Sequence, residues 1–273
     1  MYDKNNPFVG IGVPALLTNI SIAIAFRILF GNDKKRLCEA LLIYGLWPFL
    51  YLQSFCVVRQ FLAIGISVLG FALFYKKQYI VCIASYLLAI ALHPSSAVAI
   101  LFPIILKLKH CLSFSKILAI SVVVVILFGS MVAVLNSLGL MGYVNLLESD
   151  DNFGGKISFV YLALAIFLLL AVYKNKDTDT VDSKILSLLS ICVIVQFLIY
   201  VSPVPSIVSR GVLYGLIFLP ISFGYSISVV RMPLSKNQIY VIMMLFMFVY
   251  LLITKDSPGA VSQYVPYKTI WDL

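Results

Sequence analysis

The sequence has little charge. Of its 273 residues only 11% are charged, whereas 62% are hydrophobic, and the mean hydropathy is +1.05. A soluble domain carries roughly 25% charged residues, so this chain cannot cover a surface that faces water. Ten spans of about 20 residues would use about 200 positions, and the rest is too short for a separate soluble domain. The composition therefore predicts one transmembrane domain over residues 1–273, in an all-α polytopic integral membrane protein.

Residues that bind metals or carry redox chemistry are also scarce. The chain has two histidines, neither in an H-E-x-x-H pattern, and its five cysteines include no C-x-x-C pair. Scattered cysteines of this kind are typical of small packing residues in apolar helices. Asp177-Thr178-Asp179 matches a D-x-D metal–nucleotide pattern but lies among lysines in a short loop. We therefore expect no metal and no cofactor.

Acidic residues are fewer than basic ones, which gives a net charge of +9. In a membrane protein the first explanation is that cationic loops hold the topology, so no nucleic-acid partner is predicted. The first ten residues lack a basic stretch leading into a short apolar core, so we expect no cleavable signal peptide.

Apolar runs separated by charged or Pro/Gly-containing breaks predict about ten transmembrane helices (9–10). Their ranges are 8–30, 37–56, 59–75, 78–93, 94–106, 116–138, 157–173, 185–202, 207–230 and 237–254. The stretch from Gln78 to Leu106 could form one long span or a pair of short ones broken at His93-Pro94.

The positive-inside rule decides between these alternatives. With two segments and the N-terminus outside, 14 of the 20 Lys and Arg residues lie inside. One span would instead place the basic clusters at 107–116 and 174–184 outside. Proline also disfavours helix at the preceding residue and suits the first turn of a new helix. We therefore predict a break at His93-Pro94, both termini outside, and an outer loop over about 139–156.

Three cations lie near the starts of helices that descend from the outer face: Arg59, Lys156 and Arg210. A helix N-terminus carries about +0.5 charge, so a cation there is unfavourable unless an anion binds nearby. A helix start and an arginine fork together suit a phosphate. His93 opens another descending helix, with Ser95 and Ser96 after it. The alternatives are that the arginines snorkel to the headgroups, that Lys156 is an interface lysine, and that His93 is a capping residue.

The segment from Phe55 to Leu106 resembles the EpsG/Wzy-type family of bacterial polysaccharide repeat-unit polymerases. The matching elements are Arg59-Gln60, Ala63, Lys76-Lys77, His93-Pro94-Ser95-Ser96, the later pair Arg210 and Tyr214, and Tyr264-Val265-Pro266-Tyr267. Family members usually carry a Gly-Thr-Asp-Tyr-like outer motif before this region, and the sequence has none.

The resemblance implies a membrane glycosyltransferase of GT-C-like architecture that needs no metal, in the bacterial cytoplasmic (inner) membrane. Such an enzyme joins oligosaccharides carried on undecaprenyl diphosphate into O-antigen, capsule or exopolysaccharide at the outer face. Its expected partners are the lipid-linked oligosaccharides, the bilayer, a chain-length regulator and a flippase. The alternatives are a flippase or transporter of the same lipid, a membrane-bound acyltransferase, and a structural or permease subunit.

Roles for individual residues follow from the chemistry that the resemblance implies. Arg59 and Arg210 would clamp the diphosphate, and His93 would act as a base or as a further phosphate donor. Asp150 and Asp151 of the outer loop are alternative bases. The remaining residues that we expect to bind substrate are Gln60, Ser95, Ser96, Tyr214 and Lys156.

Overall fold

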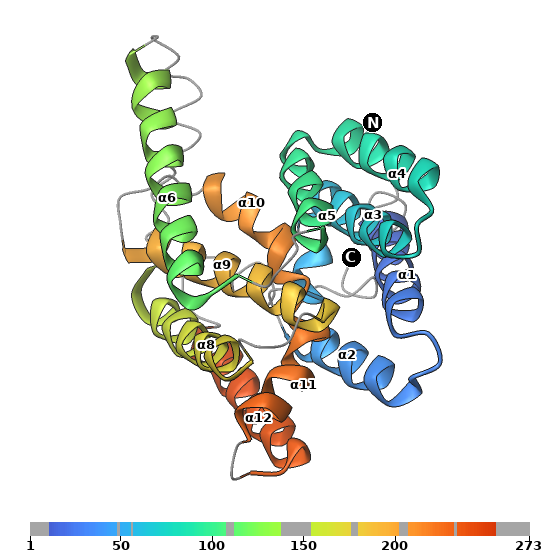
Figure 1. The fold of residues 1–273 in the computed structure, drawn as a ribbon, viewed down its shortest axis with the longest axis vertical. Coiled ribbons are helices and arrows are strands. Elements are labelled where there is room, and N and C mark those ends of the chain that lie inside the picture. Colours follow the sequence, from blue (N-terminus) through green and yellow to red (C-terminus); the bar gives the residue numbers. More distant parts are fainter. Residues whose placement is uncertain are drawn as a thin grey trace, which may run out of the picture.

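The computed structural model describes residues 11–47, 50–55, 57–107, 112–137, 154–175, 180–201, 207–231 and 234–254. Within these ranges all regular structure is helical, as the composition predicts (Figure 1). The α-helices are α1 (Val13–Phe30), α2 (Lys34–Leu46), α3 (Val58–Tyr75), α4 (Tyr79–Leu92), α5 (Leu101–Leu106), α6 (Phe114–Ser137), α8 (Gly154–Lys174), α9 (Val181–Val201), α10 (Ile207–Leu216), α11 (Leu219–Val230) and α12 (Lys236–Thr254). The described structure also has two 3₁₀ segments, η2 (Leu52–Phe55) and η3 (Pro94–Ile100).

Three of the described helices are long and apolar enough to cross a membrane: α1, α3 and α9. Shorter apolar helices accompany them, and α4 and α12 expose many large hydrophobic side chains, including Ile80 at 85% exposure. Such an apolar surface suits lipid and would be costly in water. The fold is therefore that of a multi-pass membrane protein. The total of ten spans stays a prediction.

Close helix pairs form one half of the structure, where α3 packs between α1 and α4. Gly65 of α3 allows this approach, because an added Cβ would lie 3.0 Å from the Thr18 carbonyl oxygen of α1. Gly70 has the same role toward α4, with the Ser85 side chain at 3.2 Å from the added Cβ. Small residues at helix contacts are the usual means of close packing in membranes.

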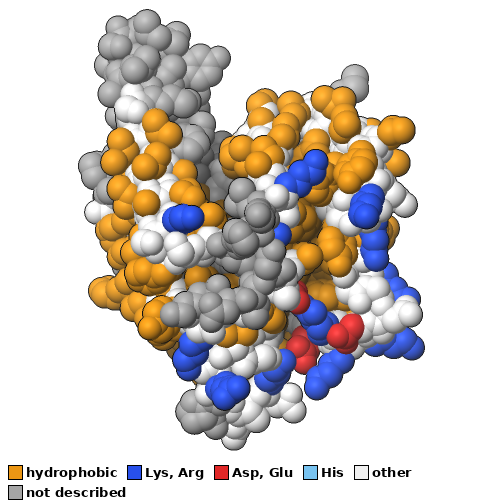
Figure 2. Space-filling model, viewed as in Figure 1, with side chains coloured by type: hydrophobic (Ala, Val, Ile, Leu, Met, Phe, Trp, Pro, Cys, Tyr) orange, Lys and Arg blue, Asp and Glu red, His pale blue; other side chains and the backbone are white. Residues whose placement is uncertain are grey.

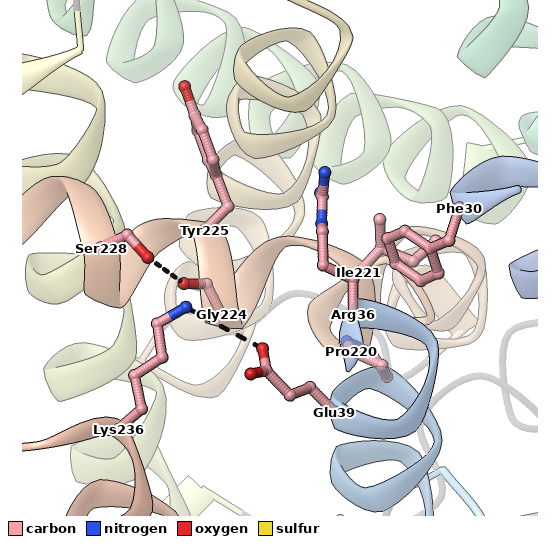
Figure 3. Close-up of a pocket in the computed structure, with 9 residues that line it drawn as sticks. All are labelled: Phe30, Arg36, Glu39, Pro220, Ile221, Gly224, Tyr225, Ser228 and Lys236. Atoms are coloured by element: carbon pink, nitrogen blue, oxygen red, sulfur yellow. Dashed lines mark hydrogen bonds and ion pairs between the residues drawn. The ribbon is translucent and has the colours of Figure 1, made fainter. Parts of the chain in front are cut away.

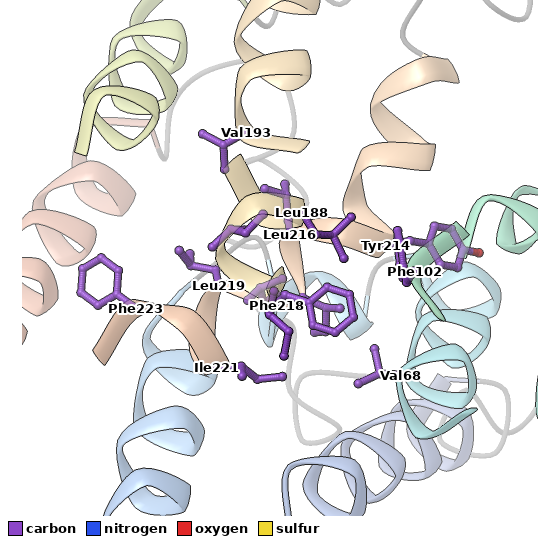
Figure 4. Close-up of a cluster of buried hydrophobic side chains, with 14 of the residues drawn as sticks. Val68, Phe102, Leu188, Val193, Tyr214, Leu216, Phe218, Leu219, Ile221 and Phe223 are labelled. Atoms are coloured by element: carbon purple, nitrogen blue, oxygen red, sulfur yellow. The ribbon is translucent and has the colours of Figure 1, made fainter. Parts of the chain in front are cut away.

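The other half is organised around α9, which contacts α6, α8, α10 and α11 (Figure 1). Most of its residues are buried, including a hydrophobic set from Ile185 to Ile199. Where the two halves meet, the Phe218 ring lies 4.7 Å from that of Phe71 and 5.3 Å from that of Phe102, as centroid distances. This contact belongs to the buried cluster in Figure 4, which joins elements far apart in the sequence.

Two of the predicted helices are broken in the structure. The predicted span 37–56 ends as helix at Leu46, because Pro48 disfavours helical backbone at Trp47, which is extended (ψ 106°). The predicted span 207–230 is two helices, α10 and α11, joined by a turn at 217–218. Pro220 lies in the first turn of α11 and cannot donate the hydrogen bond that a continuous helix would need.

The helix ends that we predict to face the cytoplasm lie together. Ion pairs and hydrogen bonds connect them across the bundle: Arg36 to Asp182, Lys236 to Glu39, Lys174 to the Val230 carbonyl and Lys184 to the Leu106 carbonyl. Figure 2 shows most of the Lys and Arg side chains over the lower part and right edge of the face drawn, with a few among the hydrophobic side chains that dominate above. The grouping of these ends agrees with the predicted topology, and the side of the membrane on which they lie stays a prediction.

Candidate functional site

Arg59 lies in the first turn of α3, and its side chain is exposed. Its Nη2 donates a long hydrogen bond of 3.5 Å to the carbonyl oxygen of Leu92, the last residue of α4. A helix C-terminus carries partial negative charge, so α4 offsets the unfavourable position of this cation at the start of α3. The contact uses one of the five guanidinium N–H donors. The next residue, Gln60, is only 1% exposed.

His93 lies at the break that the sequence predicts. Helix α4 ends at Leu92, His93 is extended (φ −153°, ψ 115°), and η3 begins at Pro94. This backbone is what a following proline imposes on a residue, and the predicted break is confirmed. Because Arg59 contacts the residue directly before His93, the two predicted site residues lie at the same end of the structure.

A chain of hydrogen-bonding side chains runs from His93 into the protein. The His93 Nδ1 atom lies 2.7 Å from Ser95 Oγ, which donates a hydrogen bond of 3.2 Å to the hydroxyl of Tyr214 in α10. Tyr214 is fully buried, and so is Ser96. The Ser96 hydroxyl also interacts with Tyr214, without a hydrogen bond of good geometry to any described residue. The structure thus brings together His93, Ser95, Ser96 and Tyr214.

The backbone of Arg210 lies in the first turn of α10, beside this cluster. Gly211 directly follows it, and an added Cβ there would lie 3.7 Å from Val98 of η3. The start of α10 therefore packs against the segment that carries Ser95 and Ser96. The side chain of Arg210 lies outside the described residues, so its part in the site stays a prediction.

The remaining predicted residues are not brought to the site by described contacts. Lys156 is in the first turn of α8, which packs mainly against α9 and α11, and its side chain lies outside the described residues. Asp150, Asp151 and the motif Tyr264–Tyr267 also lie outside them. The predicted outer loop is shorter than expected at one end, because α8 already begins at Gly154.

Two features of the site were not predicted. One is the Leu92 carbonyl as a partner of Arg59, and the other is the direct bond between Ser95 and Tyr214, 119 residues apart. Tyr214 was expected to bind substrate, and its complete burial places it behind His93 and Ser95. A pattern of hydroxyl residues after His93 was visible in the sequence, but nothing in it indicated which helix supplies their partner.

A pocket at the opposite, charged end is the other candidate. It has a volume of about 160 Å³ and lies between α2, α11 and the start of α12, with Arg36, Glu39, Tyr225 and Lys236 among its lining residues (Figure 3). Its charged groups satisfy one another: Arg36 pairs with Asp182, and Lys236 Nζ is 3.9 Å from Glu39 Oε2.

Burial lowers the pKa of Arg36, but the hydrogen bond and charge of Asp182 outweigh burial, so this pKa lies above its ordinary value. The pocket is therefore an ion-pair junction between helix ends. No group of three potential metal ligands occurs among the described residues at either end.

The EpsG family matches residues 5–269, which is nearly the whole chain. No curated protein matches, and no solved structure does.

Proposed function

Since the chain belongs to the EpsG family, which indicates a role in polysaccharide biosynthesis, we propose that it polymerises lipid-linked oligosaccharide repeat units. The substrate class is an oligosaccharide on undecaprenyl diphosphate, and the reaction takes place at the outer face of the cytoplasmic membrane. The proposed architecture is a bundle of about ten spans, similar to GT-C membrane glycosyltransferases. Family membership supports the pathway, and the site supports the reaction.

The chemistry requires two functions of the protein. The terminal sugar hydroxyl of the acceptor attacks the anomeric carbon of the donor, and the bond from that carbon to the lipid diphosphate breaks. Negative charge develops on the departing diphosphate, so a fixed cation stabilises the transition state. The attacking hydroxyl loses its proton, so a base within hydrogen-bonding distance accelerates the step.

The observation that carries the proposal is the contact between Arg59 and Leu92, the residue before His93. It places an exposed guanidinium and an imidazole at the same end of the bundle, from helices that start or end there. Arg59 serves as the diphosphate clamp, together with Arg210, whose helix begins beside η3. His93 serves as the base. Gln60 and Ser96 are buried next to these residues, and Lys156 is proposed as a further cation that the substrate would meet.

A flippase for the same lipid is the second candidate, since it also needs cations for the diphosphate. Transport would require such residues along a path through the membrane. Arg59 and His93 lie instead at one end of the described bundle, while Arg36 and Lys236 at the other end pair with acidic side chains. This distribution favours chemistry at one face over transport.

The test is the glycolipid ladder of a strain that lacks the gene, complemented with wild type, Arg59→Ala or Arg27→Ala. Arg27 is the matched control, an exposed arginine in the last turn of α1. We expect a single repeat unit on the surface lipid of the null strain, and a ladder restored by wild type and Arg27→Ala but not by Arg59→Ala. Immunoblots of membranes verify equal protein levels. A null strain with no surface repeat unit at all would contradict polymerisation and indicate flipping or supply.

A further inference from the structure

The hydrogen bonds around Ser95 indicate which ring nitrogen of His93 carries a proton. A serine hydroxyl has one hydrogen to donate, and Ser95 donates it to Tyr214 at 3.2 Å. The contact of 2.7 Å between Ser95 Oγ and His93 Nδ1 must then have the imidazole as donor. A neutral imidazole carries one N–H, so a protonated Nδ1 leaves Nε2 with a lone pair.

We propose that Ser95 and Tyr214 are positioning residues that hold neutral His93 in the Nδ1–H tautomer, with Nε2 as the proton acceptor. The role of this tautomer in catalysis rests on the proposed polymerase reaction. As the sugar oxygen bonds to the anomeric carbon, its proton moves to Nε2, and the electrons of the broken carbon–oxygen bond stay on the diphosphate. The resulting imidazolium keeps its hydrogen bond from Nδ1 to Ser95, so the site need not rearrange during the step.

The burial of Tyr214 makes this arrangement stable. Its side chain is fully buried in the hydrophobic cluster of Figure 4, so water cannot replace Ser95 as a partner of the phenol. A buried polar atom without a partner costs about 1–3 kcal/mol, which favours keeping the hydrogen bond between Ser95 and the phenol. The helix that carries Tyr214 is itself fixed, because Gly215 lies against Cys192 of α9.

Nitrogen NMR on the full chain in lipid bilayers tests the tautomer without any substrate. The chain has two histidines, so ¹⁵N-histidine labelling gives two sets of signals, and His110→Gln removes the set that does not belong to His93. At a pH where His93 is neutral, we expect a protonated Nδ1 and an unprotonated Nε2. A spectrum with the proton on Nε2 overturns the proposal.

Tyr214→Phe keeps the ring and removes only the acceptor. The Ser95 hydroxyl then turns its proton to Nδ1, and we expect the His93 signals to invert to the Nε2–H tautomer. Tyr225→Phe is the control, because it removes a tyrosine hydroxyl that binds Asn175 at the other end. An unchanged His93 spectrum in Tyr214→Phe overturns the proposal, whether or not the variant is active.

The polymer ladder adds a second readout. We expect Tyr214→Phe to slow polymerisation about 10- to 100-fold, because it weakens but does not remove a general base, whose full contribution is about 100- to 10,000-fold. Adding Ser95→Ala to Tyr214→Phe should cause no further loss, because it removes the hydroxyl that stabilises the wrong tautomer. The proposal is overturned if the double variant polymerises more slowly than Tyr214→Phe by the same factor that Ser95→Ala alone causes. A confirmed tautomer in a protein whose null strain makes a normal ladder would instead reject the polymerase function alone.

Discussion

Arg36, in the first turn of α2, forms a two-pronged ion pair with Asp182, in the first turn of α9 and 146 residues later. Nη2 lies 2.6 Å from Oδ1, and Nη1 lies 3.2 Å from Oδ2. The carboxylate occupies the N-terminal turn of α9, where the helix dipole favours negative charge, and the guanidinium fork matches its two oxygens. This ion pair connects α2 to α9, the largely buried helix around which the other half of the structure is organised.

Asp182→Asn should lower the stability of the protein by about 1 kcal/mol or less, because both partners are partly exposed. The Arg36→Ala variant should lose a similar amount, and the double variant should lose less than the sum. Thermal unfolding in detergent micelles measures all three. If the losses of the two single variants add up to that of the double variant, the ion pair contributes nothing to stability. Lys236→Ala is the comparison variant, and its loss should be smaller because the Lys236 contact to Glu39 is longer, at 3.9 Å.

Gly215→Ala should destabilise the contact between α10 and α9 by about 1–3 kcal/mol, the usual cost of overpacking. An added Cβ at this position would overlap with Cys192 Sγ and lie 2.9 Å from its Cβ. The matched control is Gly45→Ala in α2, where an added Cβ meets nothing within 4 Å. We expect that control to be neutral or slightly stabilising, since alanine favours a helix. Cys192→Ala should partly rescue Gly215→Ala, and equal melting temperatures of the two alanine variants would contradict the close approach.

Arg59→Lys should reduce polymer formation about 10- to 100-fold. An ammonium keeps the charge but not the planar fork, and a hydrogen bond to a charged group contributes about 1.5–3 kcal/mol. The ladder of the complemented null strain measures the effect, with Arg27→Lys as the control. Near-normal polymer from Arg59→Lys would reject the clamp.

Cysteine labelling tests the orientation of the bundle. In a cysteine-free background, a membrane-impermeant maleimide added to intact cells should label Tyr51→Cys but not Lys76→Cys. Both side chains are exposed, near opposite ends of the bundle. Lys76→Cys should react only after the membrane is permeabilised. The reverse pattern would place Arg59 and His93 at the cytoplasmic face and contradict polymerisation outside.

Local features of the chain were predictable. The break at His93 follows from one proline, and the common position of the basic helix ends follows from their spacing along the chain. The breaks at Trp47 and at 217–218 also have prolines beside them, at Pro48 and Pro220, but continuous apolar runs concealed both. In a chain so rich in apolar residues, hydropathy marks where helix can lie in lipid and does not show where it stops.

The sequence by itself determined that this is a helical membrane protein of the EpsG family, and it singled out Arg59 and His93. Composition, charge distribution and proline positions act through neighbouring residues, so they can be read along the chain. Only the tertiary structure decided that Tyr214 is buried behind Ser95 and that Gly215 lies against Cys192. Those contacts depend on how the surfaces of helices far apart in the sequence fit together, because packing rather than hydropathy selects partners among helices that are all apolar.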